Sequence, residues 1–170
     1  MSKFWENFFQ DRQKKTDKID DILMKIPIFQ DVKERELKKI KGILYQREYK
    51  KDEIIFNQGD VGLGMYIILE GIVEIVCGPE RKVLAELHDG DFFGELALLD
   101  ESPRSAAALV KTPCRMLCFF KPELLDLIER NPKLGSRILF KLAWTIGERL
   151  KTTNEQMREL SCLNSRNAPD

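Results

Sequence analysis

The stretch from Gly90 to Ala107 concentrates residues whose chemistry suits an anion. Gly94 permits a tight backbone approach, and the residues after it predict one turn of helix, whose free N–H groups and partial positive charge favour a negative ligand. Arg104 adds a full positive charge and a planar fork that matches phosphate oxygens. Ser105 adds a hydroxyl, and Ala106 leaves room for a ligand. These residue types in this order predict a phosphate-binding cradle.

Glu95 needs a separate explanation, because its carboxylate would repel a phosphate. Its natural partner is a hydroxyl, and a ribose next to a phosphate supplies one. The alternative is a surface corner between two strands, in which Arg104 pairs with Asp100 or Glu101 and contributes little to stability. For isolated residues the surface corner is the commoner arrangement. The order of residues along the whole stretch therefore has to distinguish the corner from a phosphate-binding cradle.

That order resembles the phosphate-binding cassette of the cyclic-nucleotide-binding domain family, over residues 93–99 and 103–106. The resemblance implies that Glu95 holds the ribose 2′-hydroxyl and that Arg104 holds the cyclic phosphate. It also implies that backbone N–H groups around Leu96 and Ala97 complete the cradle. The ligand contacts assigned in this way are Phe93, Gly94, Glu95, Leu96, Ala97, Pro103, Arg104, Ser105 and Ala106.

A long C-terminal helix is predicted to begin at Pro132 and to run to Leu160, about 43 Å at 1.5 Å per residue. Its apolar seam steps by three or four residues, close to a heptad, which favours a homodimer through residues 132–160 over a simple lid helix. The seam residues are Leu139, Leu142, Ile146, Leu150, Thr153, Met157 and Leu160.

Residues 149–155 resemble the dimerisation helix of catabolite-activator-type regulators. The resemblance implies that Thr153 and Asn154 contact the base of a bound nucleotide, and each side chain can donate and accept. Those regulators usually carry a hydroxyl side chain at the position of Asn154, so this sequence departs from their pattern there. In the family that the cassette resembles, a small apolar residue at the position of Ser105 suits cAMP and a threonine there often favours cGMP, and a serine is intermediate. The ligand is therefore expected to be cAMP or cGMP, with cAMP favoured and no further cofactor.

The elements that position these residues are predicted to be short strands flanked by helices. The expected strands are 44–49, 53–56, 64–69, 72–77, 82–87, 106–111 and 115–120. Turn residues separate them, and Gly59, Gly71 and Gly90 are expected at positive φ. The fold class is therefore mainly β with flanking helices (α+β), a sandwich or jelly roll. The resemblance narrows it to a double-stranded β-helix, or β-roll.

Three regions are expected: an N-terminal helix over 1–16, the β-roll with flanking helices over 17–130, and the long helix with a short tail over 131–170. Within 17–130, one helix is predicted up to Lys25, where Pro27 stops it, and another around residues 37–44. The N-terminal helix presents Phe4, Trp5, Phe8 and Phe9 on one face. This face is predicted to pack on the domain or on a dimer mate; a partner protein and a membrane interface are the alternatives.

The composition of the chain argues against several classes of function. Lys plus Arg and Asp plus Glu both number 28, so the net charge is zero, which argues against binding DNA through overall charge. Four cysteines without a CxxC pair and one histidine argue against a metal site and against a catalytic cysteine. No secretory signal or membrane-length apolar run is visible, and the free cysteines favour the cytoplasm. We expect no enzymatic activity.

The sequence therefore predicts a stand-alone cyclic-nucleotide sensor that signals through helix movement to an effector protein. No helix-turn-helix follows Leu160, which argues against direct DNA binding. One alternative is a degenerate docking module that binds no nucleotide. The other is a transcription regulator acting with a separate DNA-binding subunit.

Overall fold

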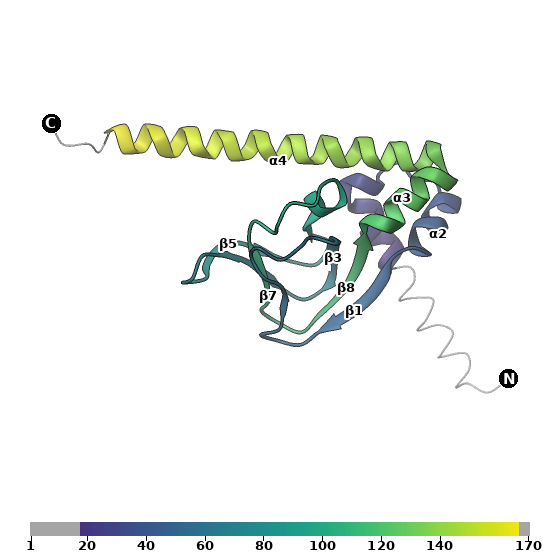
Figure 1. The fold of residues 1–170 in the computed structure, drawn as a ribbon, viewed down its shortest axis with the longest axis horizontal. Helices are drawn as coiled ribbons and strands as arrows, with labels where there is room; N and C mark the ends of the chain where they lie inside the picture. Colours follow the sequence, from purple (N-terminus) through teal and green to yellow (C-terminus); the bar gives the residue numbers. More distant parts are fainter. Residues whose placement is uncertain (1–17, 167–170) are drawn as a thin grey trace.

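Two four-stranded sheets form the centre of the molecule, in the strand orders β1-β8-β3-β6 and β2-β7-β4-β5, with every pairing antiparallel (Figure 1). The fold is that of a computed structural model, which describes residues 18–166 and their side chains through Glu159. The strands are β1 (Tyr45–Tyr49), β2 (Ile54–Phe56), β3 (Gly64–Glu70), β4 (Val73–Cys77), β5 (Lys82–Leu87), β6 (Phe92–Phe93), β7 (Ala107–Val110) and β8 (Cys114–Phe120). The predicted jelly-roll class is confirmed.

Strand β3 is buried on both faces, which explains its nearly continuous apolar sequence. Met65, Ile67 and Leu69 belong to the core beneath the helices, whereas Ile68 belongs to the core between the two sheets. Successive side chains of a strand point to opposite faces, so one strand serves both cores. The sheet that contains β3 is thereby fixed between the helices and the second sheet.

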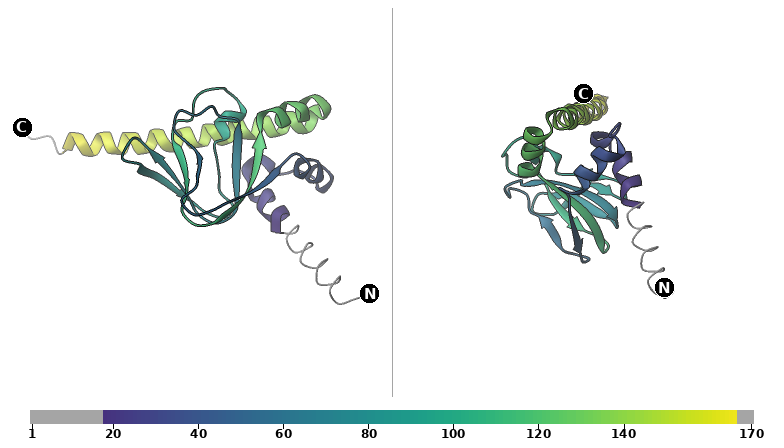
Figure 2. Two further views of the ribbon diagram at one scale, coloured as in Figure 1. Left: turned by 60° about the horizontal axis from the view of Figure 1, so that its bottom comes forward. Right: turned by 90° about the vertical axis from the view of Figure 1, so that its right-hand side faces the viewer.

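The helices cover one side of this sheet (Figure 2). Residues 18–25 are helical and lead into η1 (Pro27–Phe29) and α2 (Glu34–Lys41). After β8, α3 (Lys121–Arg130) begins with a proline in its first turn, and α4 (Pro132–Arg166) follows at once. A Cβ added at Gly135 would lie 2.5 Å from the Cα of Ile128, so a glycine permits α3 and α4 to pack this closely.

Helix α4 extends well past the β-roll (Figure 1). Its first half is part of the core, where Leu134, Ile138 and Leu142 are at most 3% exposed. From Leu150 to Glu159 every residue is exposed. Residues 150–159 of the projecting half therefore take no part in the core of this domain.

Several details differ from the sequence prediction. The seam residue Leu142 is fully buried in the domain, because it lies on the face that α4 turns toward the core. Strand β6 was not predicted, since two residues carry too little periodicity to identify a strand. Helix α4 continues to Arg166 rather than ending near Leu160. The predicted turn glycines Gly59, Gly71 and Gly90 do have positive φ, and the aromatic residues predicted at positions 4–9 lie outside the described range.

Within residues 18–166, no helix combines the length and apolar character that crossing a membrane requires.

Candidate functional site

The cassette connects β6 to β7, and Gly94 shapes its first turn. This residue adopts φ +75° and stands at the start of η2 (Glu95–Leu98), the single helical turn that was predicted. A Cβ at this position would lie 2.6 Å from Nη1 of Arg104. Glycine is therefore required twice, once by the left-handed backbone and once by the close approach of the arginine.

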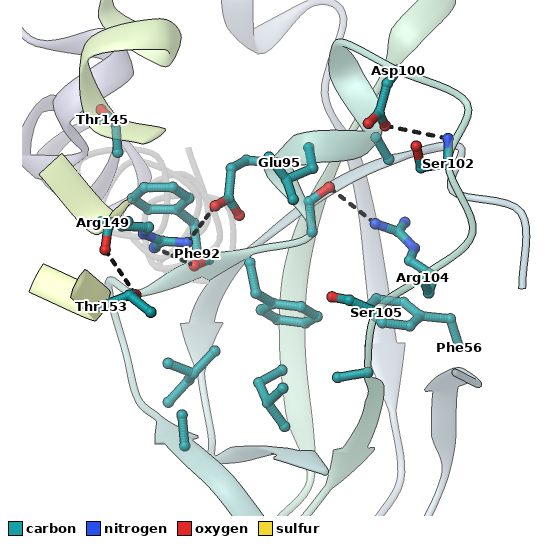
Figure 3. A pocket seen from close by; sticks show the side chains of 18 of the residues that line it. Phe56, Phe92, Glu95, Asp100, Ser102, Arg104, Ser105, Thr145, Arg149 and Thr153 are labelled. Atoms are coloured by element: carbon teal, nitrogen blue, oxygen red, sulfur yellow. Dashed lines mark hydrogen bonds and ion pairs between the residues drawn. The ribbon is translucent and has the colours of Figure 1, made fainter. Parts of the chain in front are cut away.

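Arg104 is buried rather than at the surface, with 9% of the residue exposed. Its Nη1 donates to the carbonyl of Gly94 at 3.0 Å, and its Nη2 donates to the carbonyl of Gly64 at 2.6 Å. The guanidinium lies 4.1 Å from the ring centroid of Phe56 (Figure 3). Its Nε has no hydrogen-bond partner. Two carbonyls and an aromatic ring thus hold the cation and leave part of its hydrogen-bonding capacity unused.

No ion pair to Arg104 occurs among the described residues. The surface corner with Asp100 or Glu101 is therefore rejected; Glu101 instead lies 3.5 Å from Nζ of Lys121. Burial lowers the pKa of the Arg104 guanidinium, and the charge of nearby Glu95 acts in the opposite direction. A buried cation without a bonded counter-charge is costly, so an anion entering this site gains a strong interaction.

Glu95 lies on the other side of the cavity and has a partner that sequence reasoning missed. It is 7% exposed, and Nη1 of Arg149 donates to its Oε1 at 2.6 Å. Nη2 of Arg149 donates to the carbonyl of Phe92 at 3.0 Å, and the guanidinium lies 4.3 Å from the centroid of the Phe92 ring (Figure 3). Arg149 therefore connects helix α4 to the cassette and holds the Glu95 carboxylate in place.

A cavity of about 900 Å³ joins these groups. All the predicted cassette contacts line it, from Phe93 through Ala97 and from Pro103 through Ala106, and so does Thr153. The sequence did not identify the remaining lining residues, which are Pro27, Phe56, Ile75, Ala85, Leu87, Phe92, Asp100, Ser102, Trp144, Thr145, Glu148, Arg149 and Thr152.

Helix α4 closes the cavity with two parallel rows of side chains at a spacing of four residues. One row is Thr145, Arg149 and Thr153, and the other is Trp144, Glu148 and Thr152. Asn154, predicted to contact the base together with Thr153, is exposed and is not among the lining residues. Counting back from Thr153 in steps of four would have identified the first row, because residues four apart lie on one helix face.

The arrangement suits a ligand that carries an anion, a hydroxyl and an apolar ring system. Arg104 and the N-terminal turn of η2 offer the anion site, and Glu95 offers a hydroxyl acceptor. Ile75, Ala85 and Leu87 provide apolar walls. Within the described residues, no group of three His, Cys, Asp or Glu side chains is placed to hold a metal ion.

Comparison with known proteins identifies the family. Residues 46–131 match the model of the family described as cyclic nucleotide-binding domain. The chain is similar to the cyclic AMP receptor protein of Thermus thermophilus, with 31% identity over 83% of this chain and 65% of that protein. It is also similar to a cAMP-dependent protein kinase regulatory subunit of Schizosaccharomyces pombe, with 31% identity over 67% of this chain and 29% of that protein.

Solved structures agree with this result. The Thermus thermophilus catabolite activator protein superposes with a TM-score of 0.71 at 30% identity, covering 80% of this chain and 63% of that chain. A cyclic nucleotide-binding domain from Methylobacillus flagellatus superposes with a TM-score of 0.73 at 25% identity, covering 86% and 84%. The cassette, the two-sheet fold and these similarities lead to one conclusion: the chain belongs to the cyclic nucleotide-binding domain family.

Proposed function

We propose that this chain is a cyclic-nucleotide sensor that binds 3′,5′-cyclic AMP in the cavity beneath α4. The observation that carries the proposal is Arg104, a buried guanidinium with an unused Nε and no ion pair among the described residues. The cyclic phosphate supplies the missing negative charge, and the backbone N–H groups of the η2 turn complete its contacts.

The ribose binds at Glu95 in this proposal. A ribose 2′-hydroxyl donates to a carboxylate oxygen, and Arg149 holds that carboxylate in a fixed orientation. The ligand thus bridges the cassette and α4, so its binding changes the contacts of the helix. A ligand shifts a conformational equilibrium only through such differential contacts, which makes α4 the element that carries the signal.

Thr153 supports cAMP rather than cGMP as the ligand. Its hydroxyl donates to the carbonyl of Arg149 at 2.9 Å, so its oxygen is left as an acceptor for the cavity. The 6-amino group of adenine is a donor and matches this acceptor, whereas the 6-carbonyl of guanine does not. The names of the relatives from Thermus thermophilus and Schizosaccharomyces pombe also refer to cAMP.

The output of the sensor passes through α4 to a second copy and to an effector protein. The projecting half of α4 exposes Leu150 (59%) and Met157 (62%), on the same side as Leu139. Such a seam favours a two-fold helix pair. The proposal is thus a homodimeric regulator whose partner reads the position of the paired helices.

Calorimetric titration with cAMP and with cGMP tests the binding proposal. We expect micromolar or tighter binding of cAMP. Arg104→Ala and Arg104→Lys should both weaken it by about 100-fold or more, because the charge or its fork is lost at a buried site. Arg130→Ala is the matched control, since that arginine is exposed at the end of α3 and its ion pair lies at the surface.

The outcomes separate the alternatives. If neither nucleotide binds to the folded wild-type protein, the sensor proposal is wrong and a docking module explains the fold better. Tighter binding of cGMP than of cAMP would overturn the assignment of the base. Thr153→Val tests that assignment directly, because it removes the acceptor oxygen with little change in shape, and we expect it to reduce the preference for cAMP.

A further inference from the structure

Three exposed apolar side chains and one half-buried proline lie at or near one end of the cavity. These residues are Pro27, Leu96, Phe140 and Trp144, which we call the aromatic rim. Phe140 is 71% exposed, Trp144 53% and Leu96 49%. Pro27, Leu96 and Trp144 line the same cavity, and Phe140 lies one helical turn before Trp144 on α4. Large exposed aromatic residues in one place indicate a surface that something covers.

The rim is on the side of α4 that faces the N-terminal elements. Arg137 of α4 bonds to both carboxylate oxygens of Glu36 in α2, at 2.8 and 3.1 Å, and Lys141 pairs with Asp31 at 3.0 Å. On its other side, α4 packs against α3 through Gly135. The end-on view in Figure 2 shows α3 on one side of α4 and the N-terminal helices on the other.

This position separates the rim from the proposed dimer seam. Successive helical residues are about 100° apart around the axis, so Phe140 and Trp144 are rotated by about 100–140° from the direction shared by Leu139, Leu150 and Met157. A second copy paired along that seam leaves the rim uncovered. The rim therefore requires a different occupant.

We propose that residues 1–9 of the same chain cover the aromatic rim, with Phe4, Trp5, Phe8 and Phe9 packed against it. This segment lies outside the described residues, and its spacing predicts that all four aromatic side chains share one helix face. The chain enters the described fold at Lys18 and reaches Pro27, itself a rim residue, after about 12 Å of helix over residues 18–25 and a bend at Ile26. Residues 10–17 span up to about 27 Å when extended, which is enough to bring the segment back to the rim.

Physical arguments favour the chain's own segment over an unrelated protein. A short tether gives an effective concentration in the millimolar range, so even a weak contact is populated. Aromatic side chains on both surfaces supply large apolar areas and favourable ring–ring contacts. The helix at residues 18–25, which follows the segment in the chain, lies on the side of α4 that carries the rim.

Tryptophan fluorescence tests the proposal without nucleotide, so its result is independent of the proposed function. The chain has two tryptophans, Trp5 and Trp144, and Trp5→Phe leaves Trp144 as the only reporter. In this background we add Phe4→Ser, Phe8→Ser and Phe9→Ser to remove the aromatic face. We expect acrylamide quenching of Trp144 to increase about twofold, with a red-shifted emission, as its indole surface is uncovered.

The control carries Lys3→Ser, Glu6→Ser and Gln10→Ser in the same background, which changes the opposite face and leaves the net charge unchanged. We expect Trp144 to remain protected in this variant. A second arm substitutes Phe140→Ser, a rim residue exposed enough to leave the core intact, and should also increase quenching. Equal quenching of Trp144 in all these proteins would overturn the proposal. Protection that disappears on dilution would also overturn it, because the occupant would then be a second copy.

Discussion

Two arginines approach the ligand cavity and have different tasks. Arg104 is buried and has no ion pair among the described residues, so in the proposed function it binds the anion. Arg149 has a half-exposed side chain (46%) and already bonds to Glu95. Its task is therefore to position the Glu95 carboxylate, not to bind the ligand itself. The cavity therefore combines a partly unused cation with a carboxylate that is already oriented.

The first residue-scale prediction concerns Arg149. Arg149→Ala should weaken cAMP binding about tenfold, because Glu95 loses its orientation and α4 loses its bond to the cassette. It should also lower the free energy of unfolding by about 1–3 kcal/mol, because Glu95 is buried and its carboxylate loses its bonded partner. Titration calorimetry and urea unfolding measure the two effects. Arg158→Ala, at an exposed position on the same helix, serves as the control; equal affinities of the two variants would contradict the positioning role.

The second residue-scale prediction concerns the stability of the fold at alkaline pH. Burial raises the pKa of Tyr49 from its ordinary value to about 12. The unfolded chain releases this proton near pH 10, so between about pH 10 and pH 12 the folded state holds more protons, and stability falls as pH rises. Below about pH 10 the contribution is complete. We expect Tyr49→Phe to flatten this slope in urea unfolding measured across that window, and unchanged slopes would exclude Tyr49 as the cause.

At the scale of elements, α4 is packed on the domain along its first half and exposed along the described part of its second half. Gly135 allows close packing against α3, and Arg137 and Lys141 connect the helix to the loop and helix before β1. Beyond Arg149 no described residue of α4 is buried. Arg149, at the start of the projecting half, bonds to Glu95 of the cassette.

The two glycines of α4, Gly135 and Gly147, allow a matched pair of predictions about the free energy of unfolding. Gly135→Ala places a Cβ 2.5 Å from the backbone of Ile128 and should lower the free energy of unfolding by about 2 kcal/mol. Gly147→Ala meets no heavy atom within 4 Å and should raise it by about 0.5–1 kcal/mol, because alanine favours the helix. Chemical denaturation measures both. Shifts of the same sign would show that α4 packs differently from this structure.

At the scale of the whole molecule, the exposed seam on α4 leads us to expect a homodimer. Leu150→Arg places a charge at the centre of the proposed seam and should raise the dissociation constant of the homodimer at least about 100-fold. Because Leu150 is 59% exposed in the single chain, the domain itself should remain folded. Analytical ultracentrifugation over a range of concentrations measures the effect, with Lys151→Ala as the control. A wild-type protein that stays monomeric at all concentrations would reject the dimer.

The sequence by itself determined the cassette and most of the strands. Gly94, Glu95 and Arg104 lie close together in the chain, and their roles depend on local backbone geometry that a short motif specifies. The strands were identified because turn residues and a period of two are local signals, and the expected range 82–87 agrees with β5. The helical turn after Gly94 was found for the same reason.

Only the tertiary structure decided how α4 faces the cassette. Arg149 bonds to Glu95, Trp144 lines the cavity, and Leu142 is turned into the core rather than toward a dimer mate. These contacts join residues separated by more than forty positions, and the periodicity of a helix gives its apolar faces without saying which face meets which partner. The rotation of α4 is set by its close packing at Gly135 and by the ion pairs of Arg137 and Lys141, and these depend on the folded positions of α2 and α3.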